Sequence, residues 1–145
     1  MSGSDQELEE DRRREAGRWL AVAMADMRVA SLCLDANEPM LGIAAYHCQQ
    51  AAEKVVKGML VMAGIPFAKT HDMARLGDVA LLHYPDRRDV LEELSQLTVW
   101  GHAYRYPGLE DIPEPEPSVD ALLGALANID RLARGLRALT AGKEP

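Results

Sequence analysis

Residues 40–64 read MLGIAAYHCQQAAEKVVKGMLVMAG, and this stretch decides the fold. At about 100° per residue, its small and apolar side chains fall on one face of a helix and its polar side chains on the other. The apolar face carries Ala44, Cys48, Ala51, Ala52, Val55, Val56 and Met59, and the polar face carries Tyr46, His47, Gln50, Glu53, Lys54 and Lys57. Pro39 suits the first turn of this helix, and Gly64, with Pro66 beyond it, suits its end. The small residues allow a neighbouring helix to pack closely.

A second long helix is predicted just before this one. Residues 12–37 contain no proline and a single glycine, Gly17. Their apolar side chains share one side of a helix, which carries Trp19, Val22, Ala23, Met27, Ala30, Cys33 and Leu34. Because the connection between the two long helices is short, we expect them to pair antiparallel. Residues 1–11 are polar and charged, and we expect a disordered tail there, ahead of a single domain over residues 12–141.

The second half of the chain predicts three further helices. One spans residues 72–83 with Thr70 or Asp72 as its N-cap, and the next follows residues 85–86 and runs to about residue 103. After a proline-rich loop, the last helix carries a clear apolar stripe, formed by Leu122, Leu126, Ile129, Ala133 and Leu136. The sequence therefore predicts an all-α domain.

Ser118 is the expected N-cap of that last helix, and three arginines lie off its apolar stripe. They are Arg131, Arg134 and Arg137. The simplest interpretation is that they lie on solvated surface and complement the negative end of the helix dipole.

Composition and charge limit the possible functions. The net charge of −7 argues against a protein that coats extended duplex DNA, so any contact with nucleic acid has to be local. The charged N-terminus and the absence of a long apolar run predict a soluble cytoplasmic protein that does not enter a membrane. Cys33 and Cys48 lie among apolar neighbours, which predicts reduced core thiols. No motif for a nucleotide-binding loop, a zinc site or a two-metal site occurs, so we expect neither metal nor cofactor.

Two further features point to chemistry. Asp26 projects from the apolar side of the first helix, where an unpaired carboxylate would be too costly to keep, so it should meet a cation. The candidate cations are Lys54, Lys57, His71 and Arg105, and Asp26 is either a structural ion pair or an anchor that aims one of them at a ligand. Residues 100–108, WGHAYRYPG, place a histidine, an arginine and aromatic rings at a helix end, as contacts with a nucleotide or single-stranded RNA require.

The polar face of residues 40–64 admits two interpretations. It is either a solvated surface on which Glu53 and Lys57 form an i,i+4 pair, or part of a binding site.

Four segments together resemble successive motifs of the HEPN family: EAGRWLAVAMADMRVA at 15–30, AAYHCQQAAEKVVKGML at 44–60, THDMARL at 70–76 and AYRYPG at 103–108. The last helix matches in position and not in motif. The resemblance implies an up-and-down bundle of about five helices and a homodimer. It also implies a gene neighbour that encodes a minimal nucleotidyltransferase, in pairs often described as toxin and antitoxin.

The ribonuclease branch of that family places an arginine four to six residues before a histidine. Here Ser95, Gln96 and Leu97 stand where the arginine should be, and Arg105 follows His102 in an Arg-Tyr-Pro variant of the motif. A metal-independent ribonuclease needs an acid or base and a cation for the phosphate, and His102 and Arg105 are the residues that would supply them.

Three hypotheses follow from these patterns. The first is a homodimeric module that binds a nucleotide or RNA and acts with a minimal nucleotidyltransferase. Its ligand-binding residues would be Gln50, Lys54, Lys57, His71, Arg105 and Tyr106. The second is a ribonuclease toxin with His102 and Arg105 as catalytic residues. The third is a structural dimerisation module whose polar faces only mediate assembly.

Overall fold

The computed structural model describes residues 2–67, 69–70, 72–101, 103–104 and 115–142. Within these residues the chain forms five α-helices and two short 3-10 helices, with no strand. In chain order they are α1 (Gly3–Asp35), α2 (Leu41–Met62), α3 (Met73–His83), η1 (Pro85–Arg87), α4 (Arg88–Ser95), η2 (Gln96–Gly101) and α5 (Val119–Thr140). The predicted all-α class is confirmed.

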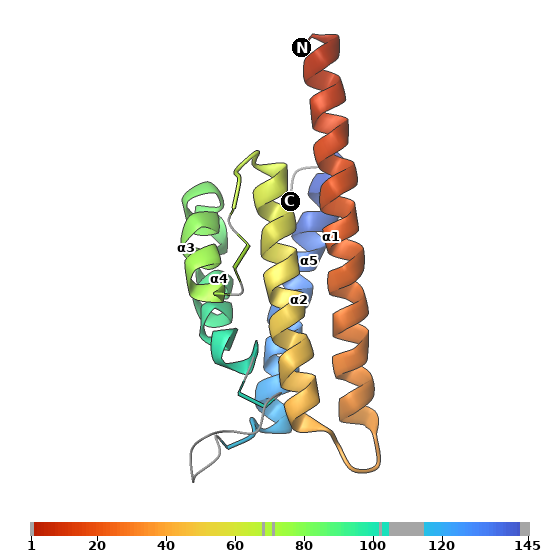
Figure 1. The fold of residues 1–145 in the computed structure, drawn as a ribbon, viewed down its shortest axis with the longest axis vertical. Coiled ribbons are helices and arrows are strands. Elements are labelled where there is room, and N and C mark those ends of the chain that lie inside the picture. Colours follow the sequence, from red (N-terminus) through yellow and green to blue (C-terminus); the bar gives the residue numbers. More distant parts are fainter. Residues whose placement is uncertain (1, 68, 71, 102, 105–114, 143–145) are drawn as a thin grey trace.

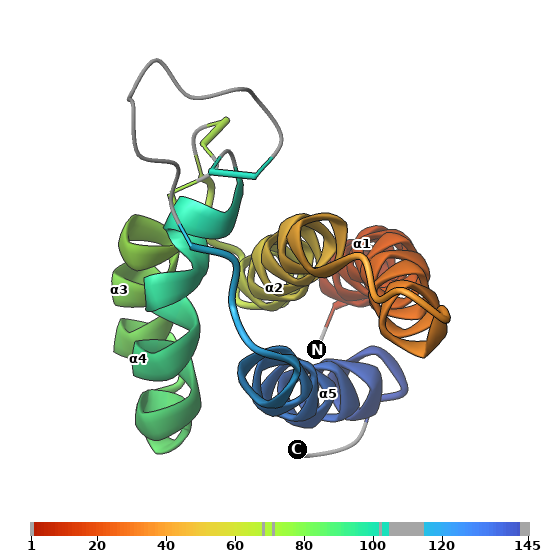
Figure 2. The same ribbon diagram turned by 90° about the horizontal axis from the view of Figure 1, so that it is seen from below.

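The helices form an up-and-down bundle around α2. The helices α1 and α2 run antiparallel, α5 packs against both, and α3 and α4 form a shorter pair on the other side of α2 (Figures 1 and 2). Seen from below, α1, α2 and α5 enclose a triangle, and α4 reaches α5 along one edge (Figure 2). As a result α2 has neighbours on nearly every side. No helix in the described part of the chain is long and apolar enough to span a membrane.

The helix expected from residue 12 begins earlier, at Gly3. Ser2 caps it, since the Ser2 hydroxyl accepts a hydrogen bond from the Asp5 backbone N–H at 3.2 Å and the Asp5 side chain reaches back to Ser2. An ion pair within the helix, Glu9 with Arg13 at 2.7 Å, supports the first turns. The boundary expected at residue 12 is thus corrected: residues 3–11 continue α1 and project beyond the rest of the bundle (Figure 1).

The end of α2 lies at the position that the sequence predicts. Gly64 has φ +71°, the left-handed conformation that glycine adopts most easily. The Ile65 N–H donates to the Leu60 carbonyl at 2.9 Å and the Gly64 N–H to the Val61 carbonyl at 3.0 Å, which forms a Schellman motif. The start differs slightly, because Pro39 precedes the helix and Met40 is its N-cap.

The helix expected to run to about residue 103 stops at Ser95 and continues as the 3-10 helix η2. The tighter helix brings Gly101 against α2, where a Cβ would lie 3.1 Å from the Gln49 Cδ. In the same element the Thr98 hydroxyl accepts a hydrogen bond from the Met73 N–H at 2.9 Å, which ties η2 to the start of α3. Contacts with other elements therefore select the 3-10 form.

Both cysteines are free and buried, as expected from the sequence. Burial raises the pKa of the Cys33 thiol. Burial, and to a lesser extent the neighbouring Cys33, raises the pKa of the Cys48 thiol to about 12. Because the thiolate is the reactive form, these are inert core residues.

Gly58 lies where α2 meets α1 and α5, and a Cβ there would lie 2.6 Å from the Leu136 Cδ2 and 3.4 Å from the Trp19 Cβ. We predict that Gly58→Leu lowers the free energy of unfolding by about 1–3 kcal/mol, because added methylenes force packed side chains out of their rotamers. The control is Gly17→Ala in α1, where no atom lies within 4 Å of the added Cβ. It should raise the stability by about 0.5–1 kcal/mol. Urea unfolding measures both, and an unchanged stability of Gly58→Leu would contradict the close packing.

Candidate functional site

The polar face of α2 is partly buried. Gln49, Glu53 and Lys57 are 0%, 1% and 7% exposed, because η2 and the neighbouring helices cover this side of α2. The interpretation as a solvated surface is therefore wrong for Glu53 and Lys57, although the i,i+4 pair that it assumed is present. A buried polar group has to be paired, so these residues take part in internal contacts.

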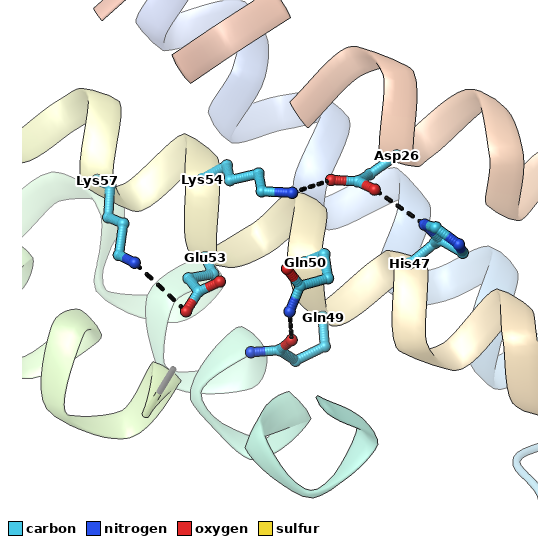
Figure 3. A network of polar contacts seen from close by, with 7 residues as sticks. All are labelled: Asp26, His47, Gln49, Gln50, Glu53, Lys54 and Lys57. Carbon is cyan, nitrogen blue, oxygen red and sulfur yellow. Dashed lines mark hydrogen bonds and ion pairs between the residues drawn. The ribbon is translucent and has the colours of Figure 1, made fainter. Parts of the chain in front are cut away.

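Asp26 bridges α1 to two basic side chains of α2. Its Oδ2 lies 2.6 Å from the Lys54 Nζ and its Oδ1 lies 2.8 Å from the His47 Nδ1 (Figure 3). The Asp26 side chain is 13% exposed, so the group sits at the edge of the α1–α2 seam rather than in open solvent. The predicted pairing of Asp26 with a cation of the second helix is confirmed.

Lys57 lies deeper and points toward a different set of groups. Its Nζ is 3.4 Å from the Glu53 Oε1. It also lies 5.5 Å from the centre of the Trp19 ring and 5.8 Å from that of Phe67. A carboxylate and two aromatic rings therefore surround this ammonium group, and both kinds of contact stabilise a positive charge.

Gln49 and Gln50 connect the polar face of α2 to η2. The Gln50 Nε2 donates to the Gln49 Oε1 at 2.7 Å, and the Gln49 side chain points toward η2 (Figure 3). The Gln49 amide lies against Gly101, since a Cβ there would come within 3.1 Å of it. Gly101 directly precedes position 102, so the polar face adjoins the start of the segment in which the sequence places His102 and Arg105.

The residues that flank positions 105–114 are held at the start of α2. The Gly42 N–H donates to the Glu116 Oε2 at 2.8 Å, and the Tyr104 hydroxyl donates to the Pro115 carbonyl at 2.7 Å. Met40 provides no side-chain cap, so Glu116 supplies the negative group that the positive end of the helix dipole favours. Residues on both sides of 105–114 thus meet at the N-terminus of α2.

The charges of this site are largely compensated. Lys54 is paired with Asp26 and Lys57 with Glu53, so neither lysine presents an isolated positive charge to a phosphate. The other proposed ligand-binding and catalytic residues, His71, His102, Arg105 and Tyr106, lie outside the described residues. Among the residues that are described, no group of three or more His, Cys, Asp or Glu side chains is suited to hold a metal ion.

Two residues of this site were not singled out from the sequence. His47 was placed on the polar face but not matched with Asp26, and Gln49 was not considered at all. The spacing of His47, Gln50 and Lys54 by three and four residues puts them on one helical stripe, which is the signal that one carboxylate can bridge His47 and Lys54. Gln49 gives no such signal, because its burial depends on the approach of η2.

We predict that Asp26→Ala lowers the free energy of unfolding by about 2–3 kcal/mol, because it leaves Lys54 partly buried without its counter-charge. Asp26→Asn should cost less, since the amide oxygen still accepts a hydrogen bond. The control is Glu92→Ala, which breaks an exposed i,i+4 pair with Arg88 and should change stability by less than about 0.5 kcal/mol. Chemical denaturation compares the three variants, and a loss for Asp26→Ala no larger than that of the control would show that the bridge contributes nothing.

Comparison with known proteins supports the assignment that the motifs suggest. A search of curated proteins and a search of solved structures each found no match to this chain. The family model of the HEPN domain matches residues 16–132, from the middle of α1 to the second half of α5. Because this match covers most of the chain, the protein belongs to the HEPN domain family.

Proposed function

We propose that this protein is a binding module for a nucleotide or RNA that acts with a minimal nucleotidyltransferase, in the manner of a toxin–antitoxin pair. Its membership of the HEPN family is consistent with a nucleotide- or RNA-related role. The proposed ligand site is the polar face of α2 together with the adjoining segment that carries His102, Arg105 and Tyr106.

The observation that supports this site most is the contact between Gln49 and Gly101. This contact holds the residue before His102 against the buried side chain of Gln49, so that the conformation of η2 depends on α2. The ion pairs of Lys54 and Lys57 fix the shape of this face. In the proposal Gln50 offers an amide to the ligand, while His71, Arg105 and Tyr106 supply the cations and the ring.

Ribonuclease activity is the alternative, and the residues before His102 argue against it. Ser95 ends α4, Leu97 is 7% exposed, and neither these positions nor Gln96 provides a cation. A cation that stabilises developing charge on a phosphate contributes roughly 3–4 kcal/mol, or about a hundredfold to a thousandfold in rate. We therefore expect metal-independent RNA cleavage to be weak or absent.

We predict that the protein retains ATP or members of a mixed RNA pool without degrading the RNA. Arg105→Ala should lose the retained ligand, and Arg88→Ala, which removes an exposed arginine of α4, should keep it. Filter retention measures the bound ligand, and gel analysis of the RNA after incubation with a chelator measures metal-independent cleavage. Cleavage by the parent protein that both His102→Ala and Arg105→Ala abolish would favour the ribonuclease. A folded protein that neither binds nor cleaves would favour a purely structural module.

We also propose that the protein is a homodimer and that α1 forms its interface. The apolar side chains of α4 are buried and its exposed side chains are charged, so α4 offers no apolar surface to a second copy. On α1, in contrast, Val22, Val29 and Leu32 are 48%, 36% and 60% exposed, although Val22 was expected in the core. Their spacing of seven and three residues makes one apolar stripe on a face that no described helix covers.

Light scattering at micromolar concentration should give twice the chain mass of 15.9 kDa. Leu32→Glu should shift the protein to the single-chain mass, because it places a charge in the proposed interface. Leu82→Glu is the matched control, since Leu82 is 80% exposed and belongs to α3, which lies on the other side of α2 from α1. A parent protein with the mass of one chain, or a dimer that only Leu82→Glu disrupts, would contradict the α1 interface.

A further inference from the structure

The C-terminal half of α5 is basic although the protein as a whole is acidic. Residues 131–142 read RLARGLRALTAG, with three arginines and no carboxylate, in a chain of net charge −7. Two exposed arginines of other helices are paired with an acidic residue three or four positions away, Arg14 with Asp11 and Arg88 with Glu92. The sequence around Arg131 and Arg137 offers no such partner three or four residues away. These two positive charges are therefore not neutralised within their helix.

The arginine side chains of this region lie on the surface of the protein. Arg131, Arg134 and Arg137 are all exposed. Arg134 uses its Nε to bind the Asp130 Oδ2 at 2.8 Å, and its side chain is still 78% exposed. Between α5 and α1 lies a groove of about 250 Å³, lined by Met24, Asp130, Ala133, Arg134 and Arg137. The one carboxylate of this groove is already engaged by Arg134.

A fourth arginine reaches the same helix from η1. The Arg87 guanidinium lies over Gly135, where a Cβ would be 3.0 Å from its Nη2. The missing side chain at position 135 lets the guanidinium lie close to the backbone of α5, next to the turn that carries Arg131 and Arg134. Arg87, Arg131, Arg134 and Arg137 together are called the α5 arginine surface below.

We infer that the α5 arginine surface binds the phosphate backbone of single-stranded RNA. One guanidinium group can donate two parallel hydrogen bonds to a phosphate group. Arginines three residues apart advance by about 4.5 Å along α5, a step short enough for a flexible strand to follow. In an acidic protein such a contact has to be local, and the lysines of α2 are already neutralised by Asp26 and Glu53. The choice of RNA as the polyanion rests on the proposed function, whereas the surface itself is separate from the polar face of α2.

The test measures binding of a labelled oligouridylate by fluorescence anisotropy over a series of salt concentrations. The variant Arg131→Gln/Arg134→Gln/Arg137→Gln should bind more weakly and reduce the slope of log K against log salt by about 2, because each phosphate contact on a single strand contributes about 0.7. Lys69→Gln/Arg75→Gln/Arg88→Gln removes the same charge from exposed residues of the α3–α4 side and should keep the parent slope. Asp130→Asn should tighten binding, because it frees Arg134 and removes the carboxylate of the groove. Circular dichroism confirms that each variant is folded.

Several outcomes would overturn the inference. One is an α5 variant that binds with the parent slope, and another is a parent protein that does not bind oligouridylate at low salt. In either case the ATP retention measured above still tests the α2 site, so the two proposals fail separately. Equal competition by polyglutamate of the same charge would also count against RNA and would favour an acidic protein segment.

Discussion

The burial of α2 on nearly all of its sides is the constraint on which the rest of the structure depends. A helix at the edge of a bundle keeps its polar residues in water, but α2 has α1 and α5 on one side and η2 and α3 on the other. Its polar residues are therefore forced into internal pairs, because an unpaired buried carboxylate or ammonium group would cost more than the fold can supply. The ion pair of Glu53 with Lys57 follows directly from this position. The bridge of Asp26 to Lys54 and His47 meets the same requirement at the seam with α1.

The same crowding explains where glycine occurs on and around α2. At Gly58 an added Cβ would meet Leu136, at Gly42 it would meet Tyr104 and Glu116, and at Gly101 it would meet Gln49. Each of these glycines therefore marks a contact of α2 with a different part of the chain. Two of the three contacts, at Gly42 and Gly101, hold the residues that flank position 102 and the 105–114 segment. The position of the candidate site therefore depends on the packing of the central helix.

Periodicity was sufficient to predict the helices whose form depends on burial of one stripe. The stripe of α5 and the stop of α2 at Gly64 are local properties, and the structure has both. The start of α1 was missed because a charged segment was interpreted as disordered, although Ser2 and Asp5 form a capping box within it. The change from α-helix to 3-10 helix at Gln96 was not predictable, since it depends on Gln49 and Met73, which are distant in sequence.

For the candidate site, the sequence predicted that Asp26 is paired but did not predict that Glu53 and Lys57 are buried. Asp26 stood out because a carboxylate interrupts an apolar stripe, and its pairing followed from the energetic cost of leaving it alone. The burial of Glu53 and Lys57 did not follow, because a helical wheel shows which residues share a face and not how many neighbours cover that face. The number of neighbours is a property of the tertiary fold, and it turned an expected surface pair into a buried one.

The basic residues of this protein consequently occur in two different settings. On α2 each lysine is held beside a carboxylate, so the polar face is close to neutral and a ligand there would be selected by shape and hydrogen bonds. On the C-terminal half of α5 the arginines outnumber the carboxylates, and attraction there acts over about a Debye length and weakens as salt is added. An acidic chain repels a polyanion over most of its surface, so a small uncompensated region determines where such a partner approaches. The protein thus separates a polar face whose lysines are paired with carboxylates from a helix end whose arginines are exposed.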